Sequence, residues 1–174
     1  DGYAFRRELL AGSPRHLKVL DTAAKMSGWG SALPDRHGRG IAFVPSFGSI
    51  VAQVAEVDMS GAKPKVKKVY VAADPGFVIN PDGFTAQMES ALAYGLTAAL
   101  KDGKVQQSNF HDYPMLRINE MPEVEVALIN GDHKHLGGGG EPGLPPIAPA
   151  VTNAIFAATG TRIRELPIAK HDFA

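Results

Sequence analysis

The chain has 174 residues, with 18 basic and 18 acidic side chains and no cysteine. A domain of this size buries roughly 70% of its unfolded-chain surface, so we expect a real hydrophobic core. The balanced charge argues against a nucleic-acid partner, and without Cys the chain has no disulfides, thiolate metal ligands or iron–sulfur ligands of its own. No apolar run reaches the ~20 residues of a membrane span. The first residues, DGYAFRRELLAG, do not resemble a signal peptide, and the missing initiator Met indicates a processed chain or an excised fragment.

Two helices are predicted near the start of the chain. Apolar residues at helical spacing predict a short helix over 4–12. Ser13 followed by Pro14 predicts the cap and first turn of a second helix, which ends at Gly28. We expect this helical segment, residues 1–29, to precede a single compact domain that occupies the rest of the chain, residues 30–174.

Several strands follow. Segments 40–44 and 48–58 are separated by a turn rich in Pro and Gly, which is typical of strand pairs. β-Branched and aromatic residues predict a third strand at 65–73, and we expect it to pair antiparallel with the second. The alternating sequence VEVALI predicts another strand at 124–129, and the tail after Gly160 is expected to add one short strand.

A long helix is predicted after the sequence DPGFVINP, at 74–81. Asn80 is a good N-cap, Pro81 a good first helical residue, and an apolar stripe continues to Leu100. The free backbone N–H groups at this helix start, next to flexible Gly76, could hold a phosphate or another anion. The alternative is an ordinary strand-to-helix turn, and this local pattern favours the turn.

Two groups of polar side chains carry weaker signals. His111 with Asp112 could form a proton-transfer pair, and His133 with His135 could form a metal pair on a strand. Adjacent residues on a strand point to opposite faces, and two His without a third ligand make a poor metal site. Neither group is therefore predicted to be functional.

The stretch 137–160, GGGGEPGLPPIAPAVTNAIFAATG, places one carboxylate on a tight turn. Four successive glycines let another group approach the main chain closely, because no Cβ is in the way. Glu141 follows and is stiffened by Pro142, and apolar residues at helical spacing predict a buried helix that ends at Gly160. On local chemistry alone, an isolated Glu is more often a solvated surface residue.

The stretch 137–160 resembles the C-terminal part of the molybdenum-cofactor-binding subunit of the xanthine dehydrogenase and aldehyde oxidase family. DPGFVINP with its helix and QSNFHDYPMLRINEMPEVEV share the resemblance, which is strongest to the isoquinoline 1-oxidoreductase beta subunit-like aldehyde dehydrogenases and covers about residues 30–168. Two positions depart from the pattern: Ala86, where much of the wider family has Gly, and Pro75, where the most similar branch carries Cys. With the element pattern, the resemblance predicts a two-layer α+β domain, a mixed β-sheet with packed helices.

The resemblance also implies chemistry. It implies an enzyme with a molybdenum–molybdopterin cytosine dinucleotide cofactor, which oxidises an aldehyde or N-heterocycle using oxygen from water. Glu141 matches the family's catalytic base beside molybdenum, and Gln87 falls where the family has a cofactor-binding Gln. The expected cofactor-binding residues are Gln87, Gly76, Asn80, Gly139 and Gly140. Partners would be the remaining domains of the molybdenum subunit and a subunit with iron–sulfur clusters; the bacterial periplasm and cytoplasm both stay open.

Two other functions are considered. The first is a non-catalytic domain that retains this fold and mediates subunit assembly; cofactor domains encoded upstream in the same gene would argue against it. The second is a Glu-dependent hydrolase built on the glycine turn, but the sequence offers no second catalytic carboxylate or His at a telling spacing.

Overall fold

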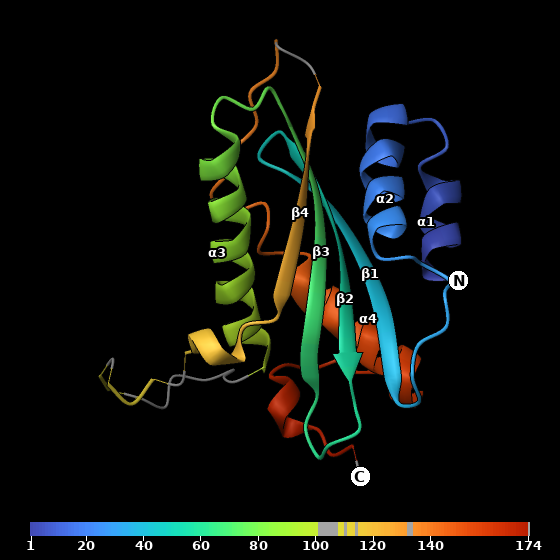
Figure 1. Ribbon diagram of the computed structural model, residues 1–174, viewed down its shortest axis with the longest axis vertical. Coiled ribbons are helices and arrows are strands. Elements are labelled where there is room, and N and C mark those ends of the chain that lie inside the picture. The colour runs from blue at the N-terminus through green and yellow to red at the C-terminus, as the bar shows by residue number, and fades with distance from the viewer. Residues whose placement is uncertain (101–107, 110, 114, 132–133, 174) are drawn as a thin grey trace.

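A computed structural model describes residues 1–100, 108–109, 111–113, 115–131 and 134–173 (Figure 1). The helices in these ranges are α1 (Gly2–Leu9), α2 (Pro14–Met26), α3 (Pro81–Leu100) and α4 (Ile147–Thr159). The strands are β1 (His37–Ser46), β2 (Ser49–Asp58), β3 (Lys65–Gly76) and β4 (Glu123–Asn130), and short 3-10 helices occupy Ile118–Glu120 and Ile168–Lys170.

The strands form one mixed sheet in the order β1-β2-β3-β4. β1 pairs antiparallel with β2, and β2 antiparallel with β3, as predicted for the second and third strands. β4 runs parallel to β3, because the connection between them returns along α3 to the same end of the sheet. The predicted α+β class with a mixed sheet is confirmed.

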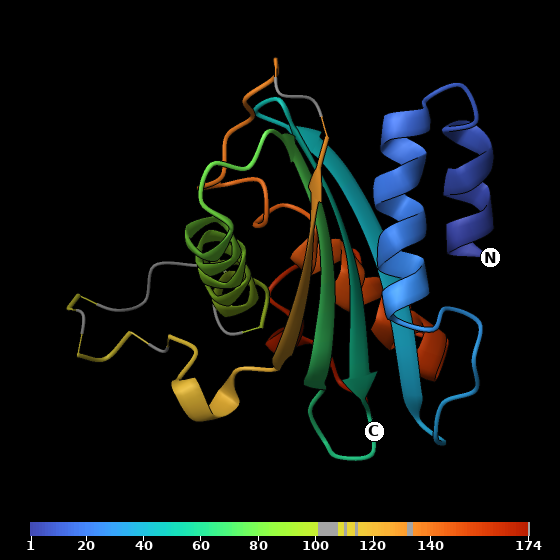
Figure 2. The ribbon, with the colours of Figure 1, turned by 45° about the horizontal axis from the view of Figure 1, so that its top comes forward.

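Helices cover both faces of this sheet. α3 and α4 pack on one face, α2 packs on the other, and α1 lies outside α2 (Figures 1 and 2). Two layers were expected, and the second helical cover is the difference. It follows from β2, which is apolar on both faces: Val51 and Ala55 face α3 and α4, whereas Val54 faces α2. Since successive strand side chains point to opposite faces, each face needs a helical cover.

β1 lies unusually close to α4. A Cβ atom added at Gly40 would overlap the Ala150 carbonyl and the Ala154 amide nitrogen, and one added at Gly38 would overlap the Ala154 carbonyl. The absence of side chains at these strand positions lets the two backbones touch. This contact fixes α4, and with it the stretch that precedes α4, against the sheet.

Most of the predicted helix ends are found. The Asn80 side chain accepts a hydrogen bond from Gly83 N–H at 2.9 Å, and Gly160 ends α4 with a φ of 75°. Ser13 precedes α2 but makes no side-chain cap hydrogen bond. α1 starts earlier than predicted because Asp1 Oδ1 accepts hydrogen bonds from the backbone N–H groups of Tyr3 and Ala4.

The predicted C-terminal strand is absent from the described residues 161–173. This segment instead contains the 3-10 helix Ile168–Lys170, and Ile168 is fully buried in the core. Pro167 has no backbone N–H to donate, so it would interrupt a strand ladder at this point.

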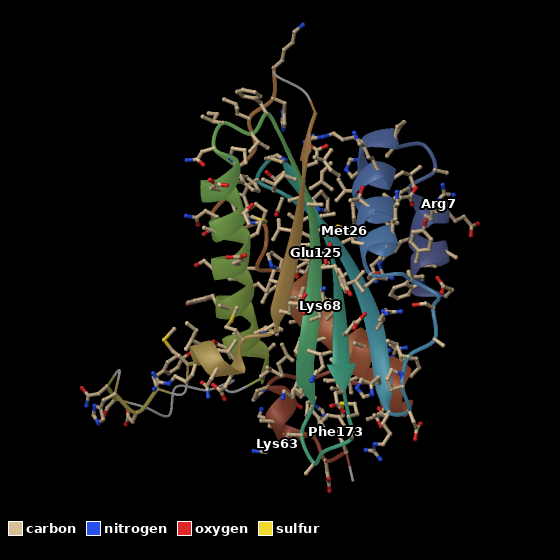
Figure 3. The ribbon with its side chains drawn as sticks, viewed as in Figure 1. Arg7, Met26, Lys63, Lys68, Glu125 and Phe173 are labelled. Carbon is tan, nitrogen blue, oxygen red and sulfur yellow. The ribbon has the colours of Figure 1, made fainter. Side chains whose placement is uncertain are left out.

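Charged side chains line the pairing of β3 with the edge strand β4. Lys68 lies 2.6 Å from Glu123 and 3.2 Å from Glu125, and Figure 3 shows Lys68 beside Glu125. The hydrogen bond to Glu123 raises the pKa of the Lys68 ammonium group. These carboxylates are at least half exposed, so the pairs contribute little stability and act mainly by keeping an edge strand charged.

Candidate functional site

The glycine loop, Gly137–Gly140, is tied to the sheet through its backbone. Gly137 N–H donates to the Pro75 carbonyl at 2.7 Å, and Gly138 N–H donates to the Phe47 carbonyl at 2.8 Å. In the other direction, Ser49 Oγ donates to the Gly138 carbonyl at 2.6 Å. The loop is therefore held between the β1–β2 turn and the end of β3.

The loop also packs too closely for side chains. A Cβ at Gly137 would overlap Ser49 Oγ, and a Cβ at Gly139 would lie 2.8 Å from the ring of Phe84 on α3. The glycines thus form a cradle between the β1–β2 turn and the first turn of α3. The predicted close approach of another group to this backbone is found here, made by the protein's own side chains.

A groove of about 280 Å³ separates the glycine loop from the start of α3. Its polar side chains are the amides of Asn80 and Gln87. Its apolar lining is Phe77, Ile79, Phe84 and Leu136. Ile79 is 76% exposed and Leu136 65% exposed, so the groove has an apolar rim that faces away from the core.

The two amides are in different states. Asn80 uses its side-chain oxygen to cap α3, and its carbonyl accepts from Phe84 N–H at 3.0 Å. The cap occupies a backbone donor that an anion would need, which favours the ordinary helix start over an anion site. The Gln87 side chain is exposed and makes no hydrogen bond to the residues that the structure describes. Its amide can therefore both donate to and accept from a ligand.

Glu141 lies on an exposed turn just beyond the glycine loop. The turn is closed by the hydrogen bond from Leu144 N–H to the Glu141 carbonyl at 2.9 Å. Pro142 and Gly143 are buried, whereas the Glu141 carboxylate is exposed and has no hydrogen-bond partner among the described residues. An exposed carboxylate without a partner can accept hydrogen bonds from another group.

The predicted site residues thus separate into three sets. Asn80, Gln87 and Gly139 line the same groove. Gly76 is buried beneath it, where a positive φ of 85° and the contact with the His135 backbone make Gly the suitable residue. Gly140 is exposed, with open space where a Cβ would be, and it lies with Glu141 outside the groove lining.

Sequence reasoning missed the apolar side of the groove. Phe84 belongs to the apolar stripe of α3 and packs against the core, and its ring also lies against Gly139. Ile79 and Leu136 belong to segments that are 57 residues apart in the sequence, and no local pattern predicts that they share a groove. The only local signal is that Ile79 directly precedes Asn80 and Leu136 directly precedes Gly137.

The His and Asp residues with weaker signals lie as follows. His135 forms a hydrogen bond between Nε2 and the Gly48 carbonyl at 2.7 Å, and His133 lies outside the described residues. His111 and Asp112 are exposed. Within the described ranges, no group of three or more acidic or His side chains is placed to hold a metal, and none of the helices there combines the length and the hydrophobicity of a membrane span.

Residues 18–122 match the protein family described as the molybdopterin cofactor-binding domain. The chain is 38% identical over 179 residues to the beta subunit of isoquinoline 1-oxidoreductase from Brevundimonas diminuta, an alignment that covers 97% of this chain and 23% of that protein. It is 34% identical over 149 residues to a subunit of nicotinate dehydrogenase from Pseudomonas putida, covering 76% of this chain and 12% of that protein. The chain therefore spans less than a quarter of the length of these relatives.

Solved structures agree with this assignment. The aldehyde oxidoreductase of Desulfovibrio gigas is 25% identical, with a TM-score of 0.59 over 71% of this chain and 16% of that chain. The aldehyde oxidoreductase of Desulfovibrio desulfuricans is 26% identical, with a TM-score of 0.58 over 68% of this chain and 14% of that chain. The predicted resemblance is confirmed, and this chain belongs to the molybdopterin cofactor-binding domains of the xanthine dehydrogenase and aldehyde oxidase family.

Proposed function

We propose that this chain supplies one wall of the cofactor site and the catalytic base of a molybdenum hydroxylase. The enzyme would oxidise an aldehyde or an N-heterocycle with oxygen derived from water. The observation that carries the proposal is that one fold presents two side chains without partners among the described residues: the Gln87 amide in the groove, and the exposed Glu141 carboxylate on the turn that follows the glycine loop. The names of the relatives, isoquinoline oxidoreductase and nicotinate dehydrogenase, support an N-heterocycle as substrate.

The residues of the groove fit a pterin cofactor. Gln87 offers an amide that can pair with the donors and acceptors of a heterocycle edge, and Gly139, with the Phe84 ring that packs against it, forms the neighbouring part of the groove wall. Asn80 adds a second amide at the groove wall, whereas Gly76 is buried and Gly140 lies outside the groove lining, so neither contributes to this wall. When bound, molybdenum–molybdopterin cytosine dinucleotide would supply the oxygen-transfer and electron-accepting chemistry.

Glu141 would act as the general base. Its carboxylate would take up the proton that the oxygen nucleophile releases as the new C–O bond forms, and such proton transfer typically contributes about 10²- to 10⁴-fold in rate. The turn is stiffened by buried Pro142 and closed by the Leu144 hydrogen bond, so the carboxylate is presented on a fixed backbone. That is the arrangement a positioned base requires.

Other parts of the active site would come from partners. Since the chain spans 23% of the isoquinoline 1-oxidoreductase beta chain, we propose that the remaining domains of a molybdenum subunit close the groove from the opposite side. Electrons would leave through iron–sulfur clusters on a partner subunit, because this chain has no cysteine to hold them.

A second function is a non-catalytic assembly domain with the same fold. The observation in its favour is the exposed apolar rim of Ile79 and Leu136, since such exposed apolar residues are typical of protein-facing surfaces. In that case Glu141 would be an ordinary surface residue, and its replacement would leave turnover unchanged.

The deciding experiment is Glu141→Gln in the complete enzyme, with Glu8→Gln on exposed α1 as the matched control. Gln keeps the shape of Glu but cannot take up the proton, so we expect turnover to fall by at least about 100-fold. Molybdenum content and Tm should stay at the parent values, and the control should be fully active. Turnover within a few-fold of the parent, at verified molybdenum loading, would contradict the general-base role and favour the assembly domain.

A further inference from the structure

Gln53 is a polar side chain in the middle of the core. It lies on β2 with no exposed surface, and it points to the same face of the sheet as Val51 and Ala55. Its Nε2 donates a hydrogen bond of 2.7 Å to the carbonyl of Gly143, 90 residues further along the chain. This bond connects the sheet directly to the turn that carries Glu141.

The other side of the same turn rests on α3. A Cβ added at Gly143 would lie 3.1 Å from Ala91 Cβ and 3.3 Å from Met88 Sδ, so the turn has little room to shift toward the helix. Met88 follows Gln87 directly in the sequence. The backbone two residues after Glu141 is therefore held between β2 and the segment of α3 that carries the groove amide.

Gln at this position carries an energetic cost of its own. Its Oε1 is buried without a hydrogen-bond partner among the described residues, and an unpaired buried acceptor is unfavourable. An apolar side chain of the same length would avoid that cost but would leave the buried Gly143 carbonyl without its donor. The one hydrogen bond that Gln53 makes goes to the Glu141 turn, and this bond is what an apolar residue could not replace.

We infer that Gln53 is a positioning residue, which fixes the Glu141 turn against the sheet and α3 so that the carboxylate is presented at a constant place beside the groove. The effect of Gln53 on catalysis rests on the proposed function. The tether itself, the hydrogen bond from Gln53 on β2 to the turn, can be tested without any cofactor.

The first test uses amide hydrogen exchange in this chain. Gln53→Met keeps an unbranched side chain of similar length and removes both the donor and the unpaired acceptor. Protection of the Leu144 amide, which closes the turn, should fall about three- to tenfold, as expected for the loss of one buried hydrogen bond. Gln53→Leu serves as a second variant.

Thr97→Val is the matched control. Thr97 is buried; its Oγ1 accepts a hydrogen bond from Leu116 N–H at 3.1 Å and donates one to the Ala93 carbonyl at 2.9 Å. This variant therefore also removes a part-buried hydrogen bond between segments, together with one inside α3. It should leave Leu144 protection at the parent value. Unchanged Leu144 protection in both Gln53 variants would overturn the inference, and so would a Tm loss in both that far exceeds the loss in Thr97→Val.

The second test uses the complete enzyme. Gln53→Met should lower kcat about tenfold, because a misplaced base loses rate, while KM and molybdenum content stay unchanged. Loss of Leu144 protection together with normal turnover in Glu141→Gln would support the tether and contradict the general-base role. Normal Leu144 protection together with an inactive Glu141→Gln enzyme would overturn the tether and leave the general base in place.

Discussion

Asp74 is a buried carboxylate at the end of β3, with a side chain that is 4% exposed. Arg15 on α2 donates to it through Nε at 2.9 Å and through Nη2 at 3.0 Å, and Gly76 N–H donates at 2.7 Å. Three donors thus satisfy one carboxylate. The pair fixes the residues that lead into the groove, and it connects them to the helix on the opposite face of the sheet.

We expect Arg15→Ala to lower the free energy of unfolding by roughly 2–4 kcal/mol, because it leaves a buried carboxylate without its cation. This cost is somewhat smaller than the roughly 3–5 kcal/mol for a fully buried pair, since the Arg15 side chain is 38% exposed. Arg7→Ala is the control, because Arg7 and Asp21 form a pair that is 54% and 36% exposed; its cost should be below about 1 kcal/mol. Urea unfolding measures both, and equal losses would contradict the special role of Asp74.

Single residues differ in how far the sequence could predict them. Asn80 and Gly160 were predicted as helix ends because capping involves only neighbouring residues. The bond from Gln53 to Gly143 and the pair of Arg15 with Asp74 join residues 90 and 59 positions apart. No local pattern encodes such contacts, so they emerge only from the fold.

At the scale of elements, α3, α4 and the antiparallel β2–β3 pair follow from apolar periodicity and turn residues. The parallel position of β4 and the cover of α2 on the second face do not. They depend on which apolar surfaces meet, and β2 alone could not reveal that its second face is also buried. Within the site, the groove amides were foreseen, but the apolar rim was not.

The close contact of β1 with α4 allows a prediction about Gly40. Gly40→Ala places a methyl group on the backbone of Ala150 and Ala154, so strand and helix must move apart. We expect a loss of at least about 2 kcal/mol in the free energy of unfolding. Gly12→Ala is the control, because an added Cβ there meets nothing within 4 Å, and its effect should stay within about 0.5 kcal/mol. Similar thermal unfolding of the two variants would show that the close packing has no energetic consequence.

At the scale of the whole molecule, the proposed function makes the groove one open side of a larger site. Ile79 and Leu136 are largely exposed, and the side chains of Gln87 and Glu141 have no hydrogen-bond partners within the described residues. Such groups gain their partners when another surface covers them. The division into residues 1–29 and a domain over 30–174 stays a prediction, and limited proteolysis of the chain can examine it.

The last prediction concerns this 174-residue chain without the rest of a molybdenum subunit: it should fold but should not retain molybdenum in stoichiometric amount. The contacts to a bound cofactor must offset the translational and rotational freedom that it loses. In this chain, the proposed contacts are limited to the groove amides and the glycine loop. The measurement is metal and pterin analysis of the purified chain, with the complete subunit from the same host as the control. Stoichiometric molybdenum in the purified chain would contradict the proposal that the chain supplies only one wall of the cofactor site, because this wall would then be sufficient to hold the cofactor.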